Sequence, residues 1–147
     1  MIIGSITEWF KEAKPTVTEK DKLVQLGVHY EEIAEMAEAL GHIQVKEHIH
    51  AIAEAFKAMP VEDESSSLLN SLTKEQHNAL LDSLCDQIVT AKGLATFMGY
   101  DIDGALDEVN RSNWSKFENG KAVFDTNGKI KKGASYTPPD LTKFLNR

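Results

Sequence analysis

Three glutamates converge on one side of a predicted helix in the stretch His29–Glu38. With 3.6 residues per turn, Glu32 and Glu35 are neighbours at i, i+3, and Glu31 and Glu35 are neighbours at i, i+4. Like charges at this spacing destabilise a helix by roughly 0.2–0.5 kcal/mol per exposed pair, and a divalent cation would reverse the sign of that interaction. The alternative is a solvated acidic face, because such runs are common on helix surfaces.

A second acidic pair, Asp82 and Asp86, is spaced i, i+4 at the head of an apolar stretch. The members of that stretch are Ile88, Val89, Ala91, Leu94, Ala95, Phe97 and Met98. A helix that is apolar on all sides is buried in a bundle, so we expect Asp86 to lie in an apolar environment and Cys85 to be a small buried residue. A buried carboxylate needs a partner. A lysine or a helix cap is one alternative, but together with the three glutamates the pattern favours a cation.

Polar side chains gather in residues 103–117, where the sequence contains Asn110, Arg111, Asn113 and Lys116. Asn110, Asn113 and Lys116 lie close on a helix at i, i+3 and i+6. Amide and cationic donors of this kind hold phosphate groups and sugar hydroxyls. The alternative is a helix end with ordinary polar residues.

The elements that would position these residues are helical for most of the chain. Helices are predicted at about 5–13, 20–40, 42–58, 73–98 and from Asp101 or Asp103 to 117, with a polar loop at 60–72. The dipeptide Asn127-Gly128 predicts a β-hairpin, and residues 141–147 predict one closing helical turn. The expected fold class is therefore all-α, a bundle of four to five main helices with a short C-terminal β-hairpin.

Apolar spacing also predicts which sides of the helices form the core. The expected buried residues are Leu23, Leu26, Ile33, Met36, Ala37 and Leu40 in the second helix, and Ile43, Ile49, Ile52, Ala53 and Phe56 in the third. The third helix also carries His42, His48 and His50, which we expect to be surface or partner-facing residues, because His48 and His50 cannot share one helix face.

Length and charge restrict the class of protein. The 147 residues suggest one domain, 1–147, with 118–147 as its hairpin and extended tail. The net charge of −7 argues against a general nucleic-acid-binding surface. The charge is uneven, because residues 1–110 carry 8 Lys/Arg and 20 Asp/Glu, whereas residues 111–147 carry 8 and 3. This asymmetry suits a metal site facing an anion-holding segment, and equally self-association of the two halves.

Cysteine usage and hydropathy add expectations about the environment. The single cysteine forms no internal disulfide, and no Cys/His spacing resembles a zinc site. The chain has no apolar run near 18 residues and no N-terminal signal pattern. We therefore expect a soluble, cytoplasmic protein without nucleic-acid or membrane partners.

The order of these features resembles a known superfamily. Glu32-x-x-Glu35, followed about fifty residues later by an acidic pair that ends in Asp86, is similar to the all-α nucleoside triphosphate pyrophosphohydrolases. That group includes MazG-like enzymes, dimeric dUTPases and phosphoribosyl-ATP pyrophosphohydrolase. The segment EVNRSNWSKF at 108–117, the Asn-Gly hairpin and YTPPDL at 136–141 resemble the phage-type MazG-like branch in particular. The resemblance covers about residues 5–142. One departure is Ser83, which stands where the family's second motif has Glu.

The resemblance implies Mg²⁺ or Mn²⁺ as cofactor and hydrolysis of nucleoside triphosphates to the monophosphate and pyrophosphate. The implied metal ligands are Glu31, Glu32, Glu35, Asp82 and Asp86, with Glu31 or Glu35 as catalytic base. Asp82 is the carboxylate nearest to the missing Glu. The host cytoplasm would be the location for a phage-encoded chain.

Substrate and partners follow from the same resemblance. The implied substrate-binding residues are Asn110, Arg111, Asn113 and Lys116, with purine deoxynucleotides such as dGTP and dATP favoured. A homodimer or homotetramer is implied, because single helices of this superfamily cannot enclose a nucleotide. Two alternatives stay open: a catalytically inactive metal- or nucleotide-binding regulatory module, and a purely structural helical oligomer.

Overall fold

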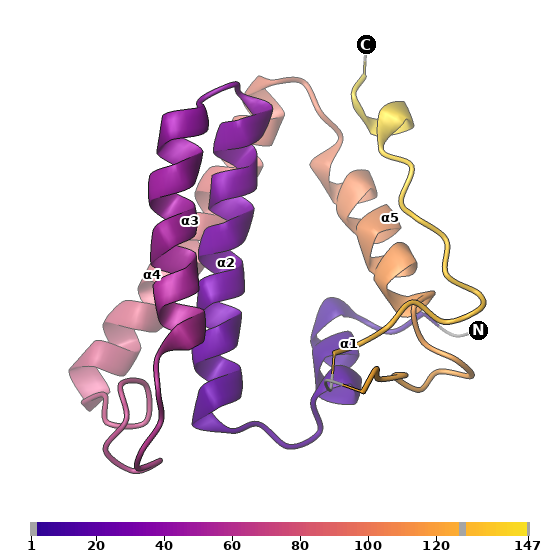
Figure 1. Ribbon diagram of the computed structural model, residues 1–147. Helices are drawn as coiled ribbons and strands as arrows, with labels where there is room; N and C mark the ends of the chain where they lie inside the picture. Colours follow the sequence, from indigo (N-terminus) through magenta and orange to yellow (C-terminus); the bar gives the residue numbers. More distant parts are fainter. Residues whose placement is uncertain (1–2, 127–128, 147) are drawn as a thin grey trace. The chain divides into compact units, whose positions relative to one another are not determined.

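The computed structural model describes residues 3–126 and 129–146, and its architecture is all-α as predicted (Figure 1). The elements are α1 (Ile6–Ala13), α2 (Glu19–Ala39), α3 (Ile43–Ala58), α4 (Lys74–Phe97), α5 (Ile102–Trp114) and a short 3₁₀ helix, η1 (Thr142–Phe144). Each predicted helix is confirmed to within a few residues. The chain divides into two compact units, Thr16–Asn78 and Met1–Pro15 with Ala79–Arg147, which are described separately below.

The helical hairpin of α2 and α3 forms the first unit. The Thr18 side chain accepts a hydrogen bond from the Asp21 amide, and the Asp21 carboxylate accepts one from the Thr18 amide, so both cap the start of α2. Gly41, with φ of +78°, follows the end of α2 in the left-handed region that favours glycine. The seam between the helices buries Leu23, Gly27, Ala34, Ala37 and Ala53.

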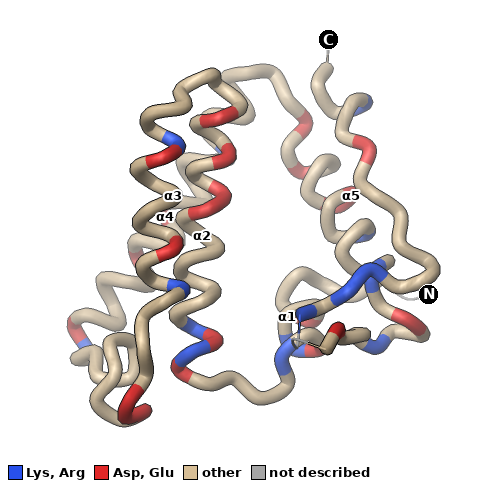
Figure 2. The backbone as a smooth tube through the Cα atoms, in the orientation of Figure 1, with Lys and Arg blue, Asp and Glu red and all other residues tan. Residues whose placement is uncertain are grey.

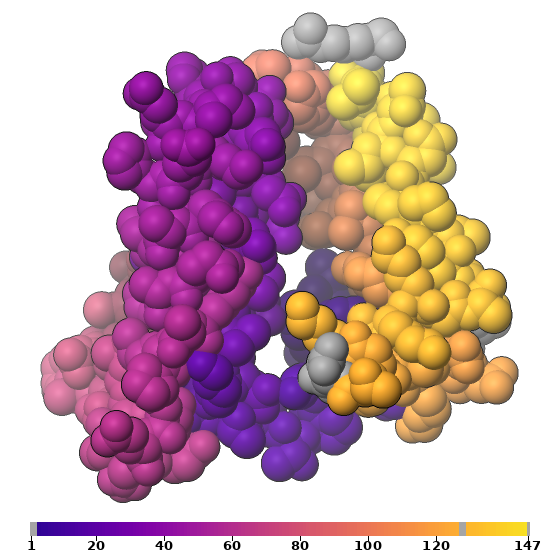
Figure 3. All heavy atoms as spheres, in the orientation of Figure 1, coloured from indigo at the N-terminus to yellow at the C-terminus, as the bar shows by residue number. Residues whose placement is uncertain are grey.

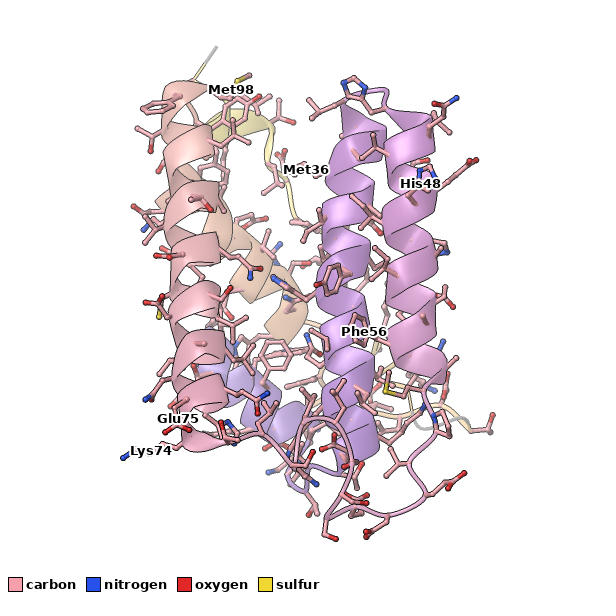
Figure 4. The ribbon with its side chains drawn as sticks, turned by 90° about the vertical axis from the view of Figure 1, so that its left-hand side faces the viewer. Met36, His48, Phe56, Lys74, Glu75 and Met98 are labelled. Atoms are coloured by element: carbon pink, nitrogen blue, oxygen red, sulfur yellow. The ribbon has the colours of Figure 1, made fainter. Side chains whose placement is uncertain are left out.

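The predicted core faces of α2 and α3 were wrong in part. Met36 and Leu40 are exposed, as are Ile43 and Ile52, whereas Leu23, Ala37 and Ala53 are buried as expected. Figure 4 shows Met36 projecting from the side of α2 that faces away from α3. The reason is packing: small residues allow the two backbones to approach closely, so the seam selects glycine and alanine over the larger apolar residues.

The loop after α3 is tied to the start of α2. Glu19 is fully buried, and its Oε1 accepts a hydrogen bond of 2.6 Å from the Leu69 amide. The Glu19 amide in turn donates to Glu64 Oε2 at 3.0 Å. The predicted polar loop is therefore fastened at two points, by the buried Glu19 carboxylate and by the helix-capping Glu64 carboxylate.

Aromatic residues from α1 and α5 build the core of the second unit. The Trp9 and Phe117 rings stack with centroids 5.4 Å apart, and Trp114 meets Phe117 edge to face at the same centroid distance. Ala13 completes the buried cluster. The Asp101 carboxylate caps α5 by accepting from the Gly104 amide. The C-terminal segment runs along α5 (Figure 1), and its atoms form the near face of this unit (Figure 3). It ends in η1, where the Asp101 amide donates to the Phe144 carbonyl.

The predicted C-terminal β-hairpin is reduced to isolated bridges. No strand occurs in residues 3–126 or 129–146, and the described pairings are single bridges, Glu118 with Lys121 and Phe124 with Ile130. The Asn127-Gly128 turn lies outside the described residues. Another Asn-Gly pair forms the tight turn that is described: Asn119 and Gly120 both have positive φ, and Glu118 and Lys121 exchange two backbone hydrogen bonds across them.

Helix α4 begins as predicted, but its apolar side chains are exposed. Thr73 and Gln76 form a capping box at its start. Ile88 is 64% exposed and Phe97 is 91% exposed, and Cys85 and Asp86 are exposed as well. Ala95 is buried as predicted, but the burial predicted for the rest of this stretch is wrong, because within its unit α4 packs on neither α1 nor α5. Among the described residues, no helix combines the length and apolar character needed to span a bilayer.

Candidate functional site

The predicted acidic side of α2 is present. Ala34 and Ala37 are buried in the seam with α3, while Glu32 and Glu35 are exposed and Glu31 is half-buried. Figure 2 shows acidic residues following one another along α2. The alanines thus orient the helix, and the glutamates occupy the positions that remain.

Burial and the neighbouring carboxylates affect the ionisation of Glu32. Partial desolvation raises the pKa of Glu32, and the neighbouring charges of Glu35 and Glu31 raise it further. A raised pKa means that the ionised carboxylate is disfavoured in the metal-free chain. A cation at this position would relieve both the repulsion and the desolvation.

Glu31 differs from its two neighbours because it already has a cationic partner. The Lys57 ammonium on α3 lies 2.7 Å from Glu31 Oε2 and 3.1 Å from Glu54 Oε1. The hydrogen bond to Glu31 is the main reason that the pKa of Lys57 is raised. Glu31 is therefore tied to α3, whereas Glu32 and Glu35 have no such partner on that helix among the described residues.

A group of possible ligands that the sequence reading missed lies beside Glu31. Ligand atoms of Glu31, His50 and Glu54 all lie within 4.8 Å of one another. His50 and Glu54 are spaced i, i+4 on α3, which was the available sequence signal. His50 was expected to be a surface or partner-facing residue; its position also allows it to be a ligand. His48 instead places Nδ1 2.8 Å from the Gln44 carbonyl oxygen of its own helix.

The second predicted acidic pair belongs to the other unit. Asp82 and Asp86 are both exposed on α4, and within that unit no described lysine pairs with either carboxylate. The nearby Lys92 pairs with Asp103 at 2.6 Å instead. The salt-bridge alternative for Asp86 thus has no partner there, and its assignment as a ligand stays a prediction.

The predicted substrate-binding residues divide into two pairs, and the first pair is occupied by structural bonds. Asn110 Nδ2 donates to the Gly4 carbonyl at 2.8 Å. Arg111 forms a two-pronged ion pair with Glu108, with both distances 2.8 Å, and also donates to Thr137 Oγ1 and the Pro138 carbonyl. The Arg111 guanidinium lowers the pKa of Glu108 to about 2, assisted by the Asp140 amide.

The second pair, Asn113 and Lys116, remains available to a ligand. Lys116 Nζ lies 2.9 Å from Asn113 Oδ1 and 5.9 Å from the centroid of the Trp9 ring. Both side chains are half-buried. A cation and an amide held next to each other on one helix end form a suitable cradle for a phosphate group.

Two serines between these residues have a role that the sequence reading did not assign. Ser112 Oγ donates to the Thr137 carbonyl at 2.9 Å, and Ser115 Oγ accepts from the Thr137 amide at 2.9 Å. Together with Arg111 they fasten the extended segment 136–140 along α5. The motif at 110–116 therefore serves two purposes: part of it holds the C-terminal segment, and part presents Asn113 and Lys116.

Comparison with known proteins does not assign the chain to a family. No protein-family model, curated protein or solved structure matches the chain. The side chains and their geometry, together with the residue-level resemblance given above, are therefore what indicates a function.

Proposed function

We propose that the chain is a metal-dependent nucleoside triphosphate pyrophosphohydrolase that acts on purine deoxynucleotides such as dGTP and dATP. The observation that carries this proposal is the crowded acidic side of α2, where the pKa of Glu32 is raised and Glu35 adds a second carboxylate. Carboxylate oxygens are the ligands that Mg²⁺ and Mn²⁺ prefer, so the donor set fits these ions.

Glu32 and Glu35 would hold the metal, with Glu31 as a further ligand or as an acceptor for metal-held water. The resemblance also implies Asp82 and Asp86 as ligands. The bound ion would neutralise triphosphate charge and lower the pKa of a water molecule. Glu35 or Glu31 would accept the proton of that water as it attacks at the α–β phosphate linkage. The products would be the nucleoside monophosphate and pyrophosphate.

Lys116 and Asn113 would hold the phosphate groups. Asn110 and Arg111, which the resemblance also implies as substrate-binding residues, would act through the backbone that they fix. The Lys116 ammonium supplies a positive charge, and the Asn113 amide supplies a donor once its carbonyl is bonded to Lys116. We assign phosphate binding to Lys116 and Asn113 because Asn110 and Arg111 already donate to backbone carbonyls.

A homodimer or homotetramer is part of the proposal. The apolar side chains of α4 give it physical support, because a long helix with exposed Ile88, Val89 and Phe97 is unfavourable in water unless a partner covers it. The partner subunit would complete the enclosure of the base.

A pyrophosphate-release assay tests the function directly. The full-length chain is incubated with Mg²⁺ or Mn²⁺ and, separately, with each of the eight common ribo- and deoxyribonucleoside triphosphates. We expect metal-dependent pyrophosphate release, fastest with dGTP or dATP. The absence of turnover with all eight would contradict the proposal.

Ser83 favours a second candidate, a catalytically inactive metal- or nucleotide-binding regulatory module. Here the carboxylate expected one turn before the end of the second acidic pair is absent, and only Asp82 is near it in sequence. This candidate predicts metal or nucleotide binding by calorimetry without release of pyrophosphate. Restoring the carboxylate with Ser83→Glu would then increase metal affinity.

A further inference from the structure

The Lys57 side chain packs against α2 at Gly27, where there is no room for a larger residue. The stem of Lys57 crosses α2 over Gly27, where an added Cβ would lie 2.5 Å from Lys57 Cγ and 2.7 Å from the Ala53 carbonyl oxygen. Gly27 is one turn before Glu31, so the ammonium arrives beside the Glu31 carboxylate. The packing of the seam therefore fixes where this positive charge lies.

The charge is placed between two carboxylates of the candidate ligand group. Lys57 pairs with Glu31 and Glu54, and these two residues, with His50, form the group whose ligand atoms lie within 4.8 Å of one another. The Lys57 side chain is 23% exposed, which is less than the 32% of Lys46, the other lysine of α3 that pairs with α2. Lys46 contacts Glu38, a turn beyond the predicted ligands.

We propose that the Lys57 ammonium is a built-in counter-ion that a divalent cation must displace from Glu31 before the acidic side of α2 is fully metal-loaded. This inference deepens the proposed function and rests on it for the location of the metal. Lys57 is a positioning residue, because it acts on the metal site through Glu31. Its presence sets the metal concentration at which the site fills, and it keeps the metal-free helix from concentrating uncompensated negative charge.

Direct measurement of Mn²⁺ binding tests the proposal. Free Mn²⁺ is quantified by electron paramagnetic resonance in titrations of wild type, Lys57→Met and Lys46→Met. Methionine retains the unbranched stem that packs over Gly27 and removes the charge. We expect Lys57→Met to bind Mn²⁺ at least about five-fold more tightly than wild type, and Lys46→Met to remain within about two-fold, because the electrostatic effect falls with distance.

Equal or weaker Mn²⁺ binding by Lys57→Met, or the same gain in Lys46→Met, would overturn the proposal. If Lys57→Met does not fold, a measurement on wild type tests the same proposal. Titration with diamagnetic Mg²⁺ should shift the Lys57 side-chain resonances with the same midpoint as the Glu31 amide. A response at Glu31 without one at Lys57, or no response at either, would contradict displacement.

The two proposals fail separately. If no nucleotide is hydrolysed but Lys57→Met still tightens Mn²⁺ binding, the counter-ion role stands and the enzyme activity does not. If wild type releases pyrophosphate and Lys57→Met leaves Mn²⁺ affinity unchanged, only the counter-ion role is lost.

Discussion

At the scale of single residues, the acidic side of α2 contains carboxylates with different surroundings. Glu31 is neutralised by Lys57, whereas Glu32 is crowded by its neighbours. A carboxylate that repels its neighbours in the metal-free chain gains the most when a cation arrives. Removal of the charge of Glu32 or Glu35 should therefore lower activity without lowering the stability of the metal-free protein.

Glu35→Gln should abolish most activity while sparing the fold. We expect pyrophosphate release to fall at least ~100-fold, as loss of a metal-coordinating group generally causes, with thermal stability of the metal-free protein unchanged or slightly increased. The matched control is Glu38→Gln, one turn further along α2, which should leave activity near that of wild type. Equal activity of Glu35→Gln and wild type would leave the solvated-face interpretation in place.

Glu108→Gln tests the ion pair that fastens the C-terminal segment. The pKa of Glu108 is lowered from 4.5 to about 2, so its contribution to stability is present above pH 4.5 and is lost as the pH falls toward 2. We expect wild type to be more stable than Glu108→Gln at pH 7 and the difference to shrink progressively below pH 4.5. Thermal unfolding at a series of pH values measures this, and a difference that persists unchanged at pH 2 would contradict the assignment.

At the scale of elements, the ends of the helices were the most reliable prediction. Ser5, Thr73 and Gly41 fall where the helices begin or end, because local hydrogen bonds and backbone sterics decide those positions. The buried sides of α2 and α3 were less predictable, because Met36 and Leu40 are apolar yet lie outside a seam that selects small residues.

The candidate site was likewise predictable only where a local sequence pattern defines it. The three glutamates of α2 are visible as a local i, i+3 and i+4 pattern. The contacts of Lys57, His50 and Arg111 were not, because each joins residues whose proximity depends on how helices or the C-terminal segment pack.

Two glycines provide a matched test of the seam. Gly27→Ala would place a Cβ 2.7 Å from the Ala53 carbonyl oxygen, so we expect a loss of about 1–3 kcal/mol in the free energy of unfolding. Gly93→Ala, in α4, meets no atom within 4 Å and should instead gain about 0.5–1 kcal/mol from helix propensity. Urea unfolding of both variants measures the change in the free energy of unfolding, which should be a loss for Gly27→Ala and a gain for Gly93→Ala. A Gly27→Ala variant as stable as wild type would show that the α2–α3 approach is not tight.

Ser115→Ala tests how the C-terminal segment is held. Removing the hydroxyl leaves the Thr137 amide without its acceptor, and we expect a loss of about 1–3 kcal/mol in the free energy of unfolding. Ser71→Ala, at an exposed loop position, should remain within about 0.5 kcal/mol of wild type. Faster hydrogen exchange at the Thr137 amide in Ser115→Ala would confirm that the contact, rather than the helix, has been weakened.

At the scale of the whole molecule, the exposed apolar residues of α4 connect stability to assembly. The protomer has a mass of 16.3 kDa, and light scattering should give two or four times that value for wild type. Val89 is 66% exposed, so Val89→Glu introduces a charge without disturbing packing within the protomer. We expect this variant to shift toward the monomer and to lose activity, because burying an unpaired charge in an interface is costly. A wild type that is monomeric at micromolar concentration and still active would contradict the proposed oligomer, while leaving the metal chemistry of α2 intact.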